Sequence, residues 1–273
     1  MARTETITSA QNPKIKTLLE LQEKSKARRR EGLFVVEGLR ELMHCISAGY
    51  QVHTIFACPE ILQESILMEI DTAVSDKGYR CNYFYISRNI YEKVAYRGST
   101  EGVIAELVCK SHSLEDLCLP ENPLVVVLES VEKPGNLGAI LRSADAAGVD
   151  AVIVCDPLTD MYNPNLIRSS IGGIFTVRTA ATSSEEAIKW LKDKKIKIYT
   201  AQLQDSEWYY DTDMSKGTAI VMGTEATGLT DVWRNAADAH IKIPMLGKLD
   251  SLNVSVSAAI LMYEAVRQRK CES

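Results

Sequence analysis

Short apolar runs alternate with amphipathic stretches along the first 110 residues of the chain. Runs rich in β-branched and aromatic residues predict strands, and apolar residues at helical spacing predict helices. The expected strands cover residues 33–37, 52–57, 83–86 and 103–108, and the expected helices cover residues 12–21, 39–48, 61–76 and 88–95. This order predicts a small α/β domain over residues 31–110.

A second alternation begins at residue 124, after a linker that Pro and Asn residues predict over residues 111–121. The run 124–128 is continuously apolar, as in strands buried on both faces of a parallel sheet. Further strands are expected at 151–155, 174–177, 196–200 and 219–222, and helices at 138–147, 185–192 and 254–270. The alternation predicts a doubly wound parallel α/β domain over residues 122–273, with a last helix that is buried on more than one side.

Composition is that of a folded globular protein. The chain has 273 residues, of which 46% are hydrophobic and 25% charged, which excludes disordered and fibrous classes. The longest segment without Asp, Glu, Lys or Arg, residues 42–59, contains His, Gly and Gln and is not apolar enough to span a bilayer. Seven Cys without a C-x-x-C pair and four unclustered His predict neither disulfides nor a metal site. A cytoplasmic protein is the expectation.

Charge is unevenly distributed along the chain. The net charge is -5, yet residues 1–30 carry eight Lys or Arg against three acidic residues, while the rest carry 23 basic and 33 acidic residues. A basic helical arm over residues 1–30 on an acidic body suits a polyanionic partner such as RNA. The alternative is a solvated helix face without a partner.

In an open parallel sheet, ligands bind at the carboxyl ends of the strands, so the loops after the expected strands are the candidate sites. The loop after residue 128 carries Gly135 and Gly138, and Asp156 follows the next strand. This layout is similar to a dinucleotide-binding fingerprint, but the tight G-x-G is absent. A dehydrogenase is therefore disfavoured.

Three loops taken together are more specific. They read Pro-Gly-Asn-Leu-Gly-Ala-Ile-Leu-Arg over residues 134–142 (motif 1), Met-Gly-Thr-Glu-Ala-Thr-Gly-Leu over 222–229 (motif 2), and Ile-Pro-Met over 243–245 continuing to Ser-Leu-Asn-Val-Ser-Val over 251–256 (motif 3). In this order and spacing they resemble the motifs of the SpoU/TrmH family of RNA ribose 2′-O-methyltransferases, of the SPOUT superfamily.

The first half of the chain resembles the same family less sharply. Residues 12–16, 34–38 and 101–105 are similar to its N-terminal substrate-binding domain. Two positions depart from the common pattern: Lys133-Pro134-Gly135 stands where many members have an Asp-Pro pair, and Ser257 stands where many have Ala.

The resemblance implies a fold and an activity. Members tie the C-terminal domain into a trefoil knot, an exception to the rule against knots, and dimerise through it. They bind S-adenosylmethionine in the knot and methylate a ribose 2′-hydroxyl, here expected in ribosomal RNA. The alternatives are a tRNA methyltransferase and a non-catalytic RNA-binding protein that keeps the knot.

The motifs also imply site residues. The resemblance assigns catalysis to Arg142, Asn136, Glu225, Ser251 and Asn253. It assigns cofactor binding to Thr200, Ala201, Leu203, Met222, Gly223, Gly228, Ile243, Met245, Leu252, Asn253 and Val254. Gly223 and Gly228 are expected to let backbone approach the cofactor and to adopt turn conformations.

The three motifs contain no His, so Arg142 is the critical residue for the acceptor hydroxyl. A guanidinium is a poor base, which favours a role in fixing the adjacent phosphate and polarising the hydroxyl, although some family mechanisms make it the base. The basic residues expected to contact RNA are Lys14, Lys16, Arg28, Arg29, Arg30, Arg97 and Arg168. Tyr91 and Tyr96 are candidates for stacking on bases or for core packing, and residues 163–173 for an RNA-facing surface or a helix that Pro164 begins.

Overall fold

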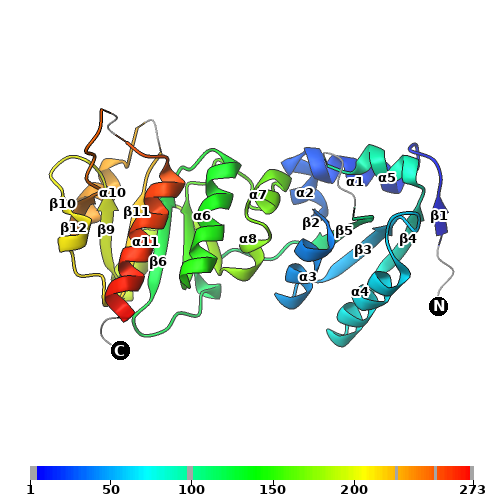
Figure 1. The fold of residues 1–273 in the computed structure, drawn as a ribbon, viewed down its shortest axis with the longest axis horizontal. Helices are drawn as coiled ribbons and strands as arrows, with labels where there is room; N and C mark the ends of the chain where they lie inside the picture. The colour runs from blue at the N-terminus through cyan, green and yellow to red at the C-terminus, as the bar shows by residue number, and fades with distance from the viewer. Residues whose placement is uncertain (1–4, 97–100, 225–226, 249–250, 271–273) are drawn as a thin grey trace. The chain divides into compact units, whose positions relative to one another are not determined.

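The computed structural model describes residues 5–96, 101–224, 227–248 and 251–270 (Figure 1). The chain divides into two compact units. Unit 1 comprises Met1–Lys110 and Met161–Arg168, and unit 2 comprises Ser111–Asp160 and Ser169–Ser273. Within the described residues, none of the helices combines the length and apolar character that a bilayer crossing needs.

Unit 1 is a five-stranded sheet covered by helices. Its strands are β1 (Glu5–Ile7), β2 (Leu33–Glu37), β3 (Val52–Ala57), β4 (Asn82–Ile86) and β5 (Val103–Val108), and its helices are α1 (Pro13–Glu23), α2 (Ser25–Glu31), α3 (Leu39–Ser47), α4 (Glu64–Asp76) and α5 (Arg88–Val94). The strand order is β1-β4-β3-β5-β2, in which β5 runs antiparallel to both of its neighbours and the other pairs are parallel. The predicted α/β domain is present, with β1 and the two N-terminal helices added to it.

The described part of the basic segment, residues 5–30, belongs to unit 1 and does not form a separate arm. Ile15, Leu18 and Leu21 of α1 are fully buried in the same apolar cluster as Val35 of β2. Asn12 begins α1 by accepting a hydrogen bond from the backbone N–H of Lys14 (2.9 Å). Because one face of α1 completes the core of unit 1, the segment cannot leave the domain without exposing these side chains.

The burial of Arg28 contradicts the prediction that this residue contacts RNA. Its side chain is only 3% exposed, and its guanidinium donates hydrogen bonds to the backbone oxygens of Leu21 (2.5 Å) and Gln22 (3.1 Å). These carbonyls lie in the last turn of α1, where they lack partners within the helix. Arg28 therefore joins α1 to α2 inside unit 1, which charge counting along the sequence could not show.

Unit 2 is a seven-stranded parallel sheet. Its strands are β6 (Leu124–Glu129), β7 (Ala151–Cys155), β8 (Thr179–Thr182), β9 (Lys197–Ala201), β10 (Glu207–Trp208), β11 (Thr218–Met222) and β12 (Ala239–Lys242). Its helices are α6 (Pro134–Ala147), α8 (Gly173–Thr176), α9 (Ser184–Asp193), α10 (Asp231–Ala236) and α11 (Val254–Lys270), with short 3-10 helices η1 (Leu114–Asp116) and η2 (Tyr209–Asp211). The strand order is β10-β12-β9-β11-β6-β7-β8, with every pair parallel.

Helices cover both faces of this sheet, as predicted for a doubly wound domain (Figure 1). On one face, Val125 and Val127 of β6 pack in a buried cluster with Leu191 of α9 and Trp233 of α10. The alternate residues of the strand point to the other face, where α6 and α11 lie side by side. The knot stays a prediction.

The element type or the unit differs from the sequence-based expectation at residues 174–177, 111–121 and 161–168. Residues 174–177, expected as a strand, form most of the short helix α8, and the strand follows as β8. A short apolar run fits either structure, and here Gly172 at φ +80° begins a helical turn that buries Ile174. The expected linker is held in unit 2, because Leu114 and Leu117 are buried in its core.

Residues 161–168, expected in the C-terminal domain, belong to unit 1. The ring of Tyr162 stacks on Phe34 of β2 at a centroid distance of 4.3 Å. Its hydroxyl accepts a hydrogen bond from the backbone N–H of Lys110 (2.7 Å). The helix α7 (Pro164–Ser169) begins at Pro164, which confirms the helical alternative for this segment.

Glu106 of β5 is a buried carboxylate in unit 1. Only 5% of the residue is exposed, its cross-strand neighbour is Thr54, and the nearest basic group is the imidazole Nδ1 of His53 at 3.6 Å. Burial raises the pKa of Glu106 from its ordinary value to about 7, and a hydrogen bond with Thr54 opposes part of this rise. The folded state therefore favours the protonated carboxyl.

We expect Glu106 to make unit 1 less stable as pH rises. Between about pH 4.5 and 7 the unfolded chain ionises this carboxyl while the folded chain keeps the proton, so about 3 kcal/mol of unfolding free energy is lost over this window. The free energy of unfolding of unit 1 is measured across this pH range by urea denaturation, with hydrogen exchange of the backbone amides of β3 to β5 as the readout. In Glu106→Gln the contribution should vanish, and in the exposed control Glu64→Gln it should persist; parallel curves for parent and Glu106→Gln would contradict the assignment.

Candidate active site

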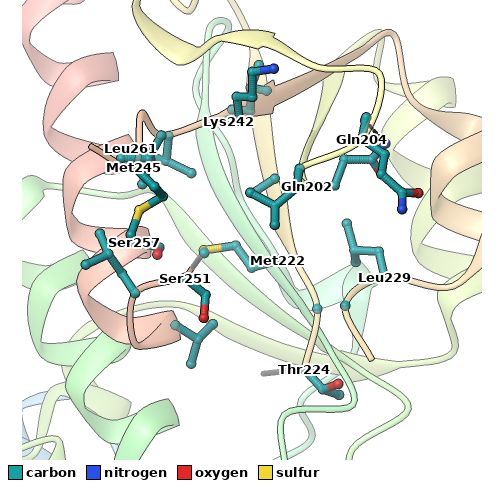
Figure 2. Close-up of a pocket in the computed structure, with 18 of the residues that line it drawn as sticks. Gln202, Gln204, Met222, Thr224, Leu229, Lys242, Met245, Ser251, Ser257 and Leu261 are labelled. Atoms are coloured by element: carbon teal, nitrogen blue, oxygen red, sulfur yellow. Dashed lines mark hydrogen bonds between the residues drawn. The ribbon is translucent and has the colours of Figure 1, made fainter. Parts of the chain in front are cut away.

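The loops that follow β9, β11 and β12 meet at one edge of the unit 2 sheet, because parallel strands end on the same side. Together with the start of α11 they enclose a pocket of about 630 Å³ (Figure 2). Figure 2 shows Gln204 and Leu229 on one side of this pocket, Met245 and Ser257 on the other, and Met222 between them. The volume is typical of a small-molecule or cofactor site.

Most residues that the motifs assign to the cofactor line this pocket. They are Ala201, Leu203, Met222, Gly223, Gly228, Ile243, Met245, Leu252, Asn253 and Val254. Thr200 is the exception: it is fully buried, and its hydroxyl lies 2.6 Å from the imidazole Nδ1 of His240. Thr200 thus connects β9 to β12 behind the pocket and does not line it.

Two polar atoms in residues of this pocket lack hydrogen-bond partners in the part of the chain that the structure describes. They are Oε1 of Gln202 and Nε of Arg234, and both are buried. The amide nitrogen of Gln202 donates to the backbone oxygen of Gln204 (2.9 Å), which fixes the side chain with Oε1 as the acceptor left over. Because both atoms are buried, a ligand in the open pocket would reach them only after these side chains turn toward it.

Sequence analysis missed both of these side chains. Gln202 lies in the loop after β9, between residues that the motif did assign. Arg234 lies on α10, a short helix that the apolar pattern did not predict. The remaining lining is largely apolar and includes the thioether side chains of Met222 and Met245.

The motif 2 loop is closed by contacts within its own backbone. Thr224 N–H donates to the backbone oxygen of Gly228 (3.3 Å), and Gly228 N–H donates to that of Thr224 (3.1 Å). Gly228 has φ +69°, as expected of a turn glycine. A Cβ on Gly223 would lie 2.3 Å from the carbonyl of Gly228, so the close approach that requires this glycine is made by the loop itself.

A buried carboxylate anchors the end of the same loop. Glu129 ends β6, is 3% exposed, and accepts hydrogen bonds from the backbone N–H (2.8 Å) and the hydroxyl (2.6 Å) of Thr230. Its Oε1 also accepts from the hydroxyl of Ser184 at the start of α9 (3.4 Å). Glu129 therefore fixes the exit of motif 2 relative to β6.

A second recess of about 90 Å³ adjoins the pocket. It is lined by Val131, Glu132, Lys133, Asn136, Gly223, Thr224 and Val254, the last three of which also line the larger pocket. Beside it, the amide nitrogen of Asn253 donates to the amide oxygen of Asn136 (3.2 Å), which joins motif 3 to motif 1 across 117 residues of sequence. The fold thus brings all three motifs together.

The predicted catalytic residues occupy different places. Asn136 lines the recess, and Ser251 and Asn253 line the larger pocket. Arg142 is exposed on α6 and lines neither cavity, and among the described residues its guanidinium has no hydrogen-bond or ion-pair partner. Glu225 lies outside the described residues.

The basic residues expected to contact RNA are not equivalent. Lys16 and Arg29 are exposed, whereas Arg30 forms ion pairs with Glu31 (2.7 Å) and Glu20 (3.4 Å). The Lys14 ammonium lies 4.4 Å from the centroid of the Phe84 ring. Arg97 lies outside the described residues.

Tyr91 and Tyr96, the two candidates for base stacking, lie in different environments. Tyr91 is fully buried and its hydroxyl accepts a hydrogen bond from Gly102 N–H (3.0 Å), so it packs in the core of unit 1. Tyr96 is half-buried; its hydroxyl donates to the amide oxygen of Asn165 (2.8 Å), and the exposed guanidinium of Arg168 lies 6.0 Å from its ring centroid. Across the described residues, no group of His, Cys, Asp and Glu is arranged to hold a metal ion.

Comparisons with known proteins agree with this geometry. Residues 123–263 match the model of the SpoU rRNA Methylase family, and residues 12–105 match that of the MRM3-like substrate binding domain. The 23S rRNA (guanosine(2553)-2′-O)-methyltransferase of Bacillus subtilis (strain 168) is 29% identical to this chain, over 94% of this chain and 97% of its own length.

Solved structures are similar over both units. A crystal structure described as an RNA 2′-O ribose methyltransferase has a TM-score of 0.82 and 36% identity, covering 97% of this chain and 99% of its own. The SpoU methyltransferase AviRb of Streptomyces viridochromogenes, solved with its cofactor AdoMet, has a TM-score of 0.86 and 26% identity, covering 95% of this chain and 99% of its own.

We expect Gly223→Ala to weaken binding of S-adenosylmethionine by at least about tenfold. The added Cβ would meet backbone atoms of Gly228 and Leu229 at 2.3 to 2.5 Å, so the motif 2 loop must move out of the wall of the pocket. Calorimetry measures the affinity, and circular dichroism checks that the variant folds. Gly135→Ala is the matched control, because its Cβ would meet nothing within 4 Å. A folded Gly223 variant with unchanged affinity would show that the cofactor binds elsewhere.

Proposed function

This chain belongs to the SpoU rRNA methylase family, and we propose that it transfers a methyl group from S-adenosylmethionine to a ribose 2′-hydroxyl of ribosomal RNA. One observation carries the proposal: the cofactor-sized pocket and the small recess adjoin at Gly223, Thr224 and Val254. A donor molecule and an acceptor group can therefore lie against each other at this boundary. The relatives, described as 23S rRNA 2′-O-methyltransferases, support ribosomal RNA as the substrate class.

The larger pocket holds the cofactor, whose sulfonium supplies an electrophilic methyl group. The apolar walls and the backbone of motifs 2 and 3 enclose it, and Gln202 and Arg234 add polar side chains to the lining. The residues proposed to bind it are the ten motif residues that line the pocket, with Gln202 and Arg234 added.

Asn136 and Asn253 orient the acceptor ribose at the recess. Their mutual hydrogen bond sets the two amides beside the recess, and the amide oxygen of Asn253 accepts from the backbone N–H (2.9 Å) and the hydroxyl (2.6 Å) of Ser255, which holds this amide in place; Ser251 lines the larger pocket with Asn253. Holding the 2′-oxygen in line with the methyl group is the first requirement of the transfer, because alignment alone lowers the barrier by several kcal/mol. Glu225, which belongs to motif 2, is proposed to assist in orienting the ribose.

Arg142 contacts the RNA and not the cofactor. Its exposed guanidinium lies outside the lining of both cavities, which suits a bidentate contact to a phosphate next to the target ribose. Bound there, it polarises the 2′-hydroxyl and lowers the cost of losing the proton. Because a guanidinium is a poor base, water or the RNA itself accepts the proton.

We expect Arg142→Ala to reduce single-turnover methyl transfer by at least about 100-fold while the affinity for S-adenosylmethionine stays unchanged. Arg142→Lys should recover little, since an ammonium cannot make the planar two-pronged contact. Single-turnover transfer of labelled methyl groups to total RNA from cells that lack the protein measures the rate, calorimetry measures the cofactor affinity, and ribose-methylation mapping locates the product. Arg178→Ala, an exposed arginine on the same unit, is the control.

The mapping also separates the alternative functions. Methylation confined to tRNA would replace ribosomal RNA as the substrate, and an absence of new methylation by the parent protein would favour a non-catalytic RNA-binding protein. Parent-like activity of Arg142→Ala would remove the role assigned to this arginine.

We propose further that the protein is a homodimer that forms through α11. Val256 (47% exposed) and Tyr263 (50% exposed) lie seven residues apart on one face of this helix, with the partly exposed Ile260 between them. An exposed apolar stripe of this kind suits an isologous contact with a second copy. Met262 is fully buried within its own unit and cannot contact a partner.

Tyr263→Glu is expected to convert the dimer to a folded monomer, because it places a charge in the interface. Met262→Glu is expected to unfold unit 2 instead, since the charge would be buried without a partner. Light scattering with circular dichroism reads both outcomes, and Lys192→Glu on the exposed side of α9 is the control. A parent protein that is monomeric at micromolar concentration would refute the dimer.

Unit 1 supplies the remaining RNA contacts in this proposal. The exposed side chains of Lys16 and Arg29 contact RNA phosphates irrespective of the base sequence. Arg168 and Tyr96 offer a cation beside an aromatic ring. Arg97 is proposed from its sequence position alone, and Arg30 contributes only if RNA displaces Glu31 and Glu20.

A further inference from the structure

Unit 1 contains a cavity that the proposed chemistry does not use. It measures about 720 Å³ and lies between α1, the α2–β2 junction and one face of strands β3, β4 and β5. The lining residues central to its chemistry are Lys14, His53, Thr54, Asn82, Phe84 and Glu106. Its lining therefore combines charged, hydroxyl and amide side chains with the aromatic ring of Phe84.

Glu106 is the main acceptor in this cavity. It is 5% exposed, and among the described residues no Lys or Arg lies within ion-pair distance of it; His53 is the nearest basic group, at 3.6 Å. A carboxylate in this position offers two oxygens that a donor-rich partner can use. Because the carboxyl group is buried, water competes less for its oxygens, and a ligand that donates two hydrogen bonds to them is favoured.

Phe84 and Lys14 define the other requirements. Phe84 is half-buried and lies beside the buried Phe56 at a centroid distance of 5.8 Å and an interplanar angle of 34°, so the Phe84 ring is the main aromatic surface of the cavity. The Lys14 ammonium lies over the face of the Phe84 ring, 4.4 Å from its centroid, so a base that stacks on this face takes the place of the ammonium and moves it to the edge of the base. The amide of Asn82 is held by a hydrogen bond to the backbone oxygen of His53 (3.3 Å) and lines the same wall.

A flat ligand with two adjacent donors on one edge and acceptors on the next edge meets these requirements. Guanine has this pattern: N1–H and the exocyclic amine lie side by side, and O6 and N7 follow. Adenine and cytosine present one amino group beside an acceptor, and uracil presents a single N–H. A carboxylate therefore pairs with guanine through two hydrogen bonds and with the other bases through fewer.

We propose that this cavity binds an unpaired guanine of the substrate RNA, with Glu106 accepting from its N1–H and amine, Phe84 against its ring and Lys14 at its O6 and N7 edge. RNA is commonly read in this way, by stacking an unpaired base and hydrogen bonding to its edge. The inference rests on the proposed function, because it takes RNA as the substrate. It adds a base-specific contact on unit 1 to the phosphate contacts named above.

Binding of free nucleotides to the full-length protein tests the proposal without any methyl transfer. Saturating S-adenosylhomocysteine blocks the cofactor pocket, and saturation-transfer NMR titrations compare guanosine, inosine and adenosine monophosphates. Inosine lacks only the exocyclic amine of guanosine. We expect the guanosine nucleotide to bind at least about tenfold more tightly than the other two, as a lost bidentate pair implies.

Variants assign the binding to this cavity. Glu106→Gln should lower the affinity for guanosine monophosphate to that for inosine monophosphate, since an amide nitrogen would face the donors of the base. Glu64→Gln, exposed on α4, should leave it unchanged. Phe84→Leu provides a second variant that keeps Glu106, and it should weaken all three nucleotides.

The pH dependence gives an independent readout. Affinity of the parent for guanosine monophosphate should rise between pH 6 and pH 8, as the carboxyl of Glu106, whose pKa is raised to about 7, becomes ionised. The other titratable groups that line the cavity are His53 on β3, which lies 3.6 Å from Glu106, Lys14 on α1 and Glu31 at the end of α2. Glu106→Gln should remove the rise if Glu106, rather than His53, controls it.

Equal affinities for guanosine and inosine monophosphate, or guanosine affinity unaffected by Glu106→Gln, would overturn the proposal. Neither result bears on methyl transfer, which the RNA mapping measures separately. A protein that binds guanosine monophosphate here but methylates no RNA would retain this site and lose the proposed function instead.

Discussion

Met222 at the end of β11 lies level with Leu128 near the end of β6, and one residue earlier Val221 lies level with Thr200 of β9. This parallel register brings motif 2 and the loop after β9 to the same edge of the sheet, and motif 1 starts from the same edge after β6. A shift of one residue would turn each buried strand side chain to the opposite face, so the apolar faces hold the register in place. The position of the site follows from that packing.

The loops at this edge are held by a few specific contacts and not by extended secondary structure. Glu129 fixes the exit of motif 2, the bridge between Thr224 and Gly228 closes its turn, and Asn136 meets Asn253 between motifs 1 and 3. A site of preorganised loops can orient donor and acceptor without large rearrangement on binding. The side chains of Gln202 and Arg234 add polar groups to the largely apolar lining that these loops form.

The two units contribute different chemistry to one proposed task. Unit 2 carries the adjoining cavities in which we propose that methyl transfer takes place, whereas unit 1 offers exposed cations and a cavity with a buried carboxylate. Phosphate contacts strengthen binding to any RNA, while hydrogen bonds to a base edge distinguish one RNA from another. The net charge of -5 for the whole chain does not reveal this division, because the exposed cations Lys16 and Arg29 both lie on unit 1.

The amino-acid sequence by itself determined the alternation of strands and helices, because apolar periodicity is a local property of the chain. The order and spacing of its three motifs resembled a known family, and that resemblance implied about half of the pocket lining. The sequence located 52–57, 103–108, 151–155 and 254–270 at the bounds that the structure has. It misplaced the strand near residue 174, where a short apolar run fits helix and strand equally well. Tertiary structure alone decided the rest: the burial of Arg28, Tyr91 and Met262, the turning of Thr200 toward His240, and the cavity around Glu106. Each depends on contacts between residues distant in sequence, and side-chain type does not reveal which partner a folded chain will bring to it.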